Sequence, residues 1–217
     1  MINLLIMGKP GAGKGTQAAL VIEHFHLKHI STGDIYREEM QKQSPIGLLA
    51  KSYVDNGGLV PDDITNKIVE NVLRAGNYPN GFMLDGYPRT IDQAVNLDRI
   101  LKDLSIKLDA VIDVEVSNPV IMRRITGRRI CSRCQETYHI ENKPPKVPGI
   151  CDICGGPLIQ RKDDTEDAVK TRLVLYGEKT KPLLEYYHKQ GLLMTVNGEL
   201  PSEVVFNQIV ARLEAVS

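Results

Sequence analysis

The chain has 217 residues, of which 42% are hydrophobic, and its 27 basic side chains balance its 27 acidic ones. This length suits one α/β domain with an inserted subdomain, and the zero formal charge excludes the strongly basic surface typical of nucleic-acid-binding domains. No apolar run approaches the ~20 residues of a membrane helix, and the apolar N-terminus lacks the basic segment of a signal peptide. We therefore expect a cytoplasmic protein with neither a nucleic-acid nor a membrane partner.

Apolar runs alternate with helically spaced segments along most of the chain. In chain order, the pattern predicts a strand at 2–7, a glycine-rich loop, a helix to about residue 24, a short strand at 29–30, and helices from near 35, at 46–55 and at 62–75. It then predicts a strand at 81–85, a helix at 90–104, a strand at 110–116, a helix near 119–126, a long helix at 167–187, a strand at 192–196 and a final helix from 202. Strands that alternate with helices form parallel sheets. The sequence therefore predicts an α/β fold with a five-stranded parallel sheet and flanking helices.

The glycine-rich loop carries the best-defined motif. The segment from Gly8 to Lys14 fits the pattern GxxxxGK, in which backbone N–H groups and the following helix N-terminus surround a phosphate while the lysine reaches the transferring group. The strand before the loop and the helix after it are the context that this motif requires. We therefore expect a fold of the P-loop NTPase type.

Two oxygen-bearing residues are candidates for contact with magnesium. The residue after Lys14 is Gly15 instead of the usual serine or threonine, so a hydroxyl contact falls to Thr16. Asp85 ends a short apolar strand, and parallel strands present their carboxyl ends to the ligand crevice. We expect Asp85 to hold magnesium through water; the alternative is an aspartate that caps a turn.

The segment from 127 to about 165 has a different composition, with prolines, few large apolar residues and all four cysteines of the chain. The cysteines form two CxxC pairs, Cys131 with Cys134 and Cys151 with Cys154, separated by 16 residues. This spacing is typical of a four-thiolate zinc site, and a metal with four protein ligands has no place for substrate, so the zinc is expected to be structural. Two disulfides, four free thiols and a nucleic-acid-binding zinc ribbon are the alternatives.

Three ordered motifs give the chain a resemblance to the adenylate kinase family over essentially its whole length. They are the run from Gly8 to Thr16, Ser31-Thr32-Gly33-Asp34 with Arg37, and Asp85-Gly86-Tyr87-Pro88-Arg89 with Gln93. The cysteine-bearing insert resembles the long form of the family found in Gram-positive bacteria. The resemblance implies a core of residues 1–30, 61–127 and 166–217, an AMP-binding flap at 31–60 and a small zinc-ribbon-like lid at 128–165.

The resemblance also implies an activity and its residues: reversible transfer of the terminal phosphoryl group of Mg-ATP to AMP, giving two ADP. The implied AMP site comprises Thr32, Arg37, Gly58, Leu59, Val60, Gly86, Tyr87, Pro88, Arg89, Gln93, Arg161 and Arg172. The implied ATP site comprises Gly11, Ala12, Gly13, Lys14, Gly15, Thr16, Arg128, Thr137, Tyr138 and Leu200. The implied catalytic residues are Lys14, Asp85, Arg89, Arg124, Arg128, Arg161 and Arg172.

The residue types suit this chemistry. Arg37 and Arg89 can each donate two charge-assisted hydrogen bonds to a phosphate, and the Gln93 amide offers a donor and an acceptor to a base edge. An AMP phosphate already carries negative oxygens, so no general base is needed. A kinase for another nucleoside monophosphate, such as UMP or CMP, and a P-loop GTPase switch are the alternatives. We expect a monomer, because no heptad pattern is visible.

Overall fold

Five strands form the central sheet of the computed structural model, which describes residues 1–215. The strands are β1 (Ile2–Met7), β2 (Lys28–Ser31), β3 (Gly81–Asp85), β4 (Ala110–Glu115) and β8 (Leu193–Asn197). They lie in the order β2-β3-β1-β4-β8, and every neighbouring pair is parallel. The predicted five-stranded parallel sheet is therefore confirmed. The last two residues of the predicted core segment 166–217 lie outside the described residues.

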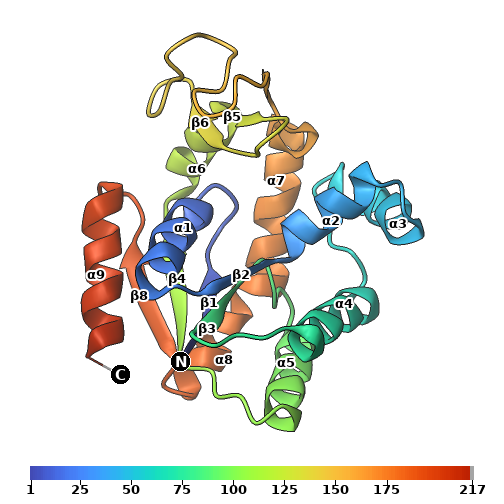
Figure 1. Cartoon of the computed structure of the whole chain (residues 1–217), viewed down its shortest axis with the longest axis vertical. Coiled ribbons are helices and arrows are strands. Elements are labelled where there is room, and N and C mark those ends of the chain that lie inside the picture. Colours follow the sequence, from blue (N-terminus) through green and yellow to red (C-terminus); the bar gives the residue numbers. More distant parts are fainter. Residues whose placement is uncertain (216–217) are drawn as a thin grey trace.

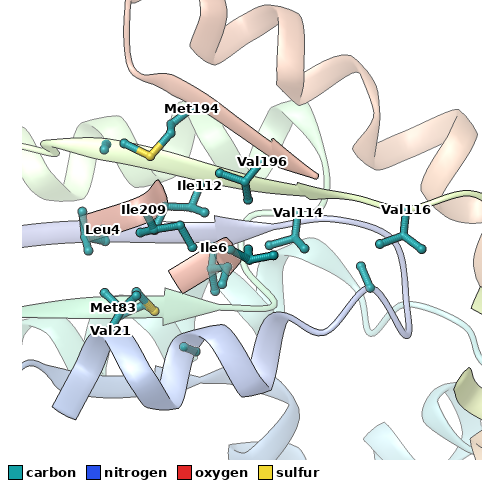
Figure 2. Close-up of a cluster of buried hydrophobic side chains, with 14 of the residues drawn as sticks. Leu4, Ile6, Val21, Met83, Ile112, Val114, Val116, Met194, Val196 and Ile209 are labelled. Atoms are coloured by element: carbon teal, nitrogen blue, oxygen red, sulfur yellow. The ribbon is translucent and has the colours of Figure 1, made fainter. Parts of the chain in front are cut away.

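Helices cover both faces of the sheet because successive side chains of a strand point to opposite faces. On β1, Leu4 and Ile6 belong to one buried cluster, shown in Figure 2, and Leu5 and Met7 belong to the other. The first cluster is closed by α1 (Lys14–Phe25), α6 (Asn118–Thr126) and α9 (Ser202–Glu214). The second is closed by α4 (Asp62–Ala75), α5 (Ile91–Asp103) and α8 (Pro182–Lys189). Within residues 1–215, every helix is too short or too polar to span a bilayer.

Two short helices, α2 (Thr32–Gln41) and α3 (Pro45–Val54), follow β2 and project to one side of the sheet (Figure 1). The Ser31 hydroxyl accepts a hydrogen bond from the Asp34 N–H at 3.2 Å and so caps α2. Because the cap is Ser31, α2 begins three residues before the predicted start near Ile35.

A small antiparallel sheet lies between α6 and the next helix, at one end of the molecule (Figure 1). Its strands are β5 (Arg128–Cys131), β6 (Thr137–His139) and β7 (Leu158–Ile159), in the order β6-β5-β7. A single turn of 3₁₀ helix, η1 (Lys162–Asp164), returns the chain to the core. These strands are too short to show a two-residue periodicity in the sequence, so only the composition of the insert was predictable.

The predicted unbroken helix at 167–187 is wrong in its middle. The structure has α7 (Glu166–Leu175), a π-helical turn η2 (Tyr176–Thr180) and then α8. Pro182 has no N–H to donate, and its ring excludes a regular helical turn before it. The Lys181 N–H instead donates five residues back, to the Tyr176 carbonyl at 2.7 Å. Wide turns of this kind are frequent at functional sites, and Tyr176 and Thr180 line one of two clefts above the sheet.

Candidate active site

The loop between β1 and α1 has the geometry of an anion-binding loop. Gly13 precedes α1 in a left-handed conformation with φ of 98°, and no side chain caps the helix, so the first N–H groups of α1 remain free for a ligand. Gly8 has φ of +138°, and a Cβ atom there would lie 2.5 Å from the Val114 carbonyl oxygen. Only glycine therefore lets the loop pack this closely against β4.

Lys14 spans the loop from inside. Its Nζ donates to the carbonyl oxygens of Gly8 and Lys9, both at 2.9 Å. Burial lowers its pKa to about 8, with Asp85 opposing the shift and the nearby Arg89 adding to it. An ammonium group with so little hydration interacts strongly with a phosphate that enters the loop.

Asp85 lies at the carboxyl end of β3, and its partner across the sheet is Ile6 of β1. Its carboxylate is 3.8 Å from His29 Nε2. Burial alone would raise the pKa of Asp85, but the contact with His29 and the charge of Lys14 hold it below its usual value. The carboxylate therefore stays ionised, as a magnesium ligand must. Thr16 is exposed on the first turn of α1.

Two cavities, of about 560 and 630 Å³, meet above the sheet. The first lies over the glycine loop, and among its lining residues are Gly8, Lys14, Tyr87, Pro88 and Tyr176. The second lies beside α2 and α3, and among its lining residues are Thr32, Arg37, Gly58, Val60 and Gln93. Their common wall consists of Gly57, Leu59, Gly86, Arg89 and Arg172. The structure thus gathers most residues of the expected AMP site around the second cavity.

The cations around these cavities are placed for a polyanion. Burial lowers the pKa of Arg161 to about 10, and repulsion from Arg37 and Arg128 adds to the shift. Burial also lowers the pKa of Arg172 to about 10, with Asp163 opposing the shift and Arg128 and Arg89 adding to it. Burial also lowers the pKa of Arg89. Among the described residues, the Nε atoms of Arg37 and Arg161 are buried without a hydrogen-bond partner. Buried donors without a partner are rare, so these two indicate where an anion binds.

The other residues expected to bind the donor nucleotide lie farther from the cavities or on their rim. Arg124 Nη1 donates to the Ala12 carbonyl of the glycine loop at 3.2 Å. A Cβ atom at Gly198 would lie 3.1 Å from that same carbonyl oxygen, so the turn that carries Leu200 lies beside the loop. Thr137 is exposed on β6, whereas Tyr138 is buried with its hydroxyl 3.5 Å from Cys151 Sγ. A nucleotide contact for Thr137 and Tyr138 stays a prediction.

The four cysteines converge at the end of the small sheet. Their Sγ atoms all lie within 4.8 Å of one another, with 3.4 Å between Cys131 and Cys154 and 3.5 Å between Cys134 and Cys151. Zinc bound tetrahedrally at ~2.3 Å places its sulfur ligands roughly 3.8 Å apart. The spacing and the all-thiolate donor set therefore fit a closed zinc site.

Asp113 is a buried acid that no motif contains. It lies on β4 with 3% of its surface exposed, and its Oδ1 has no hydrogen-bond partner among the described residues. Burial raises its pKa to about 6; Glu115 adds to the shift, and Lys14 and Lys9 oppose it. Because the carboxyl is charged at pH 7 in spite of this burial, Asp113 destabilises the folded state.

Replacing Asp113 with asparagine is therefore expected to stabilise the protein at neutral pH, by roughly 2–3 kcal/mol for a pKa shift of this size. The unfolded carboxyl titrates near pH 4 and the folded one near 6. The gain should accordingly be full above pH 7, shrink between pH 6 and 4, and vanish below pH 4. Urea unfolding at pH 4, 5.5 and 7.5 measures it. Equal stability of the two proteins at pH 7.5 would contradict the prediction.

Comparison with known proteins identifies the family. The family model described as adenylate kinase matches residues 6–192 of the chain. The chain belongs to the adenylate kinase family. The adenylate kinase of Listeria innocua is 50% identical over 205 residues, which are 94% of this chain and 95% of the relative. Those of a Thermoanaerobacter species and of Clostridium tetani are 49% identical over 208 residues and 46% identical over 216 residues, covering 96% and 100% of both chains.

Two acids outside the adenylate kinase motifs hold arginines of the expected site in place. Asp163 and Asp164 form η1, where Asp163 accepts from Arg172 Nη1 at 2.9 Å. Asp164, fully buried, accepts from Arg128 Nε at 2.9 Å and also pairs with its Nη2. Arg128 is therefore engaged in an ion pair at the base of the insert. Two adjacent aspartates were visible in the sequence, but their partners depend on tertiary structure.

Proposed function

We propose that this protein catalyses the reversible transfer of the terminal phosphoryl group of Mg-ATP to AMP, giving two ADP. The observation that carries the proposal is the common wall of the two cavities. A donor nucleotide held by the glycine loop and an acceptor held beside α2 would meet at Arg89 and Arg172, which line both cavities. Membership in the family supports the same assignment.

The chain supplies position and charge for the transfer. An oxygen of the AMP phosphate forms a bond to the γ-phosphorus of ATP, and the bond from that phosphorus to the bridging oxygen breaks and leaves ADP. No proton has to move, because the attacking oxygen is already ionised. The residues need only align the two phosphates and neutralise the charge spread over the transferring group. The cations placed to do so are Lys14, Arg89, Arg161 and Arg172, all of them partly buried.

Water is the competing acceptor, so the reaction requires a site closed around both nucleotides. We assign this role to the AMP-binding flap, residues 31–60, and to the lid, residues 128–165. The core of 1–30, 61–127 and 166–217 carries the sheet and the glycine loop. The flap supplies Arg37 to the second cavity. The segment after the lid strands carries Arg161, near enough to Arg37 and Arg128 for their charges to lower its pKa.

Metal use and assembly follow from the same residues. Magnesium enters with ATP, and Asp85, with Thr16, would hold it through oxygen atoms. Cys131, Cys134, Cys151 and Cys154 would hold a structural zinc that stabilises the insert. Both cavities are built by one chain, so a monomer suffices for activity. Four clustered thiols suit a reducing compartment, and we place the enzyme in the cytoplasm.

A coupled assay with Mg-ATP and each of AMP, GMP, UMP and CMP tests the proposal. We expect the highest kcat/KM with AMP. A preference for UMP or CMP would instead assign the chain to another nucleoside monophosphate. GTP hydrolysis without any acceptor, together with no transfer to AMP, would favour a nucleotide-binding switch.

The pH dependence of ATP use should report the pKa of Lys14. Only the protonated ammonium attracts phosphate, and the pKa in the free enzyme is about 8. The value of kcat/KM for ATP should therefore be level below pH 7.5 and fall toward tenfold per pH unit as pH rises above 8. Lys14→Arg, whose guanidinium stays charged, should remove this descent while lowering the absolute rate. A level profile up to pH 9.5 in the wild type would contradict the prediction.

A further inference from the structure

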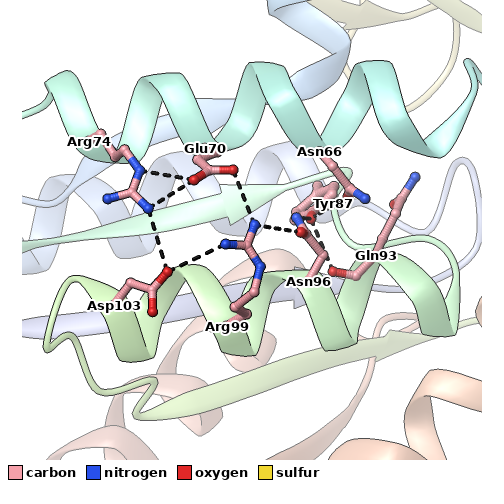
Figure 3. A network of polar contacts seen from close by, with 8 residues as sticks. All are labelled: Asn66, Glu70, Arg74, Tyr87, Gln93, Asn96, Arg99 and Asp103. Carbon is pink, nitrogen blue, oxygen red and sulfur yellow. Dashed lines mark hydrogen bonds and ion pairs between the residues drawn. The ribbon is translucent and has the colours of Figure 1, made fainter.

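The side-chain amide of Gln93 is held at both ends. Gln93 lies in the first turn of α5 with 2% of its surface exposed, next to Tyr87 (Figure 3). Its Oε1 accepts from the Arg89 N–H at 2.7 Å, and its Nε2 donates to Asp62 Oδ1 at 2.7 Å. A backbone N–H can only donate and an ionised carboxylate can only accept. The amide therefore has one permitted orientation. If it were reversed, its NH₂ group would face the Arg89 N–H and its oxygen would face the Asp62 carboxylate, so neither hydrogen bond could form.

Asp62 is itself fixed. It is the first residue of α4, and its Oδ2 accepts from the Thr90 hydroxyl at 2.6 Å. The Thr90 hydroxyl oxygen also accepts from the Gln93 N–H at 3.2 Å and so caps α5. Asp62, Thr90 and Gln93 thus form a closed ring of hydrogen bonds between α4 and α5. Through this ring, the Asp62 carboxylate fixes the nitrogen end of the Gln93 amide, while the Arg89 N–H holds only its oxygen end.

The fixed orientation of the Gln93 amide limits which bases it can recognise. One N–H of Gln93 Nε2 is bonded to Asp62, and one lone pair of Oε1 accepts from Arg89, so the amide keeps one free donor and one free acceptor. Gln93 lines the second cavity, where a base could use both. In adenine, the 6-amino donor stands beside a ring-nitrogen acceptor. A 6-oxo purine places an acceptor where adenine has its donor. A fixed amide matches only the first pattern, whereas an amide free to turn could match both.

We propose that Asp62 is a positioning residue for base specificity: by locking the Gln93 amide, it makes the acceptor site select 6-amino purines against 6-oxo purines. The proposal rests on the proposed function, since it concerns the acceptor nucleotide of the same reaction. It assigns to Asp62 no contact with substrate and no part in the transfer itself.

The test compares AMP with inosine 5′-monophosphate, which differs in bearing a 6-oxo group and a protonated N1. We expect Asp62→Ala to lower the ratio of kcat/KM for AMP to that for inosine monophosphate by about tenfold or more, within the range of one bidentate base contact. The change should appear mainly in KM for the acceptor, with KM for ATP unchanged. Asp62→Asn retains an oxygen that can accept from Gln93 and should keep the ratio within about threefold of the wild type.

Asp63→Ala is the matched control, because Asp63 is the next residue of the same helical turn, carries the same charge and is exposed. It should leave the ratio unchanged. A wild-type ratio in Asp62→Ala, with AMP transfer intact, would overturn the proposal and leave the proposed function standing. A wild type inactive with AMP would instead overturn the proposed function, and the proposal with it.

A measurement on the unaltered protein keeps the proposal testable if Asp62→Ala does not fold. In the ¹⁵N-labelled wild type, one Nε2 proton of Gln93 should exchange with water much more slowly than that of a free glutamine side chain, because it is bonded to Asp62. Exchange of both protons at the rate of free glutamine would show that the amide is not held, and would overturn the proposal.

Discussion

Replacement of Arg89 with alanine is expected to lower kcat by about 10³-fold or more, the range seen when an arginine is lost from a phosphoryl-transfer site. Arg89 lies in the wall between the two cavities, where the transferring group would pass. Its Nε–H bond to the Gly86 carbonyl, at 2.8 Å, fixes the guanidinium plane. A buried and oriented charge stabilises the transition state more than the same charge in water would.

Arg99→Ala is the control for this experiment. Arg99 is half exposed on the outer side of α5, where it pairs with Glu70 at 3.2 Å and with Asp103 at 3.4 Å (Figure 3). Surface ion pairs of this kind contribute little to folding stability, and Arg99 lines neither cavity, so kcat should not change. Arg89→Lys keeps the charge but loses the forked geometry and should recover only part of the rate. A kcat for Arg89→Ala within tenfold of the wild type would contradict the assigned role.

The second large effect is expected from the cysteine cluster. Cys151→Ala removes one of four converging thiolates, and a site with three ligands holds zinc far less tightly. The small sheet buries little else: its apolar cluster consists of Cys131, Cys151, Tyr138 and the partly buried Leu158, and Ile130 is the one further buried apolar residue on its described strands. Losing several kcal/mol from this part of the chain would lower the temperature of heat inactivation by roughly 10 °C.

Metal content and heat inactivation should be measured together on the wild type and on two variants. The wild type should contain about one zinc per chain and Cys151→Ala none. Ile153→Ala is the matched control, because Ile153 lies between Cys151 and Cys154 with 69% of its surface exposed. It should keep both the metal and the heat resistance. A metal-free wild type that is no less heat-resistant would contradict the zinc assignment.

The three inner strands β3, β1 and β4 were predictable because they are buried on both faces and read as continuous apolar runs. The Gly81–Asp85 strand even has its predicted bounds. The break in the helix before Pro182 was not found, since Leu183 and Tyr187 continue the apolar spacing across it. The strands of the insert could not be predicted, because their stability depends on the cysteine cluster and not on apolar periodicity.

Some residues of the site could likewise be predicted from the sequence, and others could not. The glycine loop, Arg37 and Arg89 stand in ordered motifs, so their types and spacing point to a phosphate site. The acids that orient other side chains of the site lie outside these motifs: Asp62 reaches Gln93 across 31 positions, and Asp164 reaches Arg128 across 36. Pairings over such distances follow from the packing of α4 on α5 and of η1 beside the lid strands. A single sequence carries no local signal for them.

Incubation of the purified protein with Mg-ADP alone tests the central claim most directly, because the reaction then needs both cavities and no added acceptor. ³¹P NMR should show ADP converted to ATP and AMP in equal amounts, with no inorganic phosphate at early times. Unchanged ADP, or phosphate release without AMP and ATP, would contradict the view that two nucleotides meet at Arg89 and Arg172 for direct transfer.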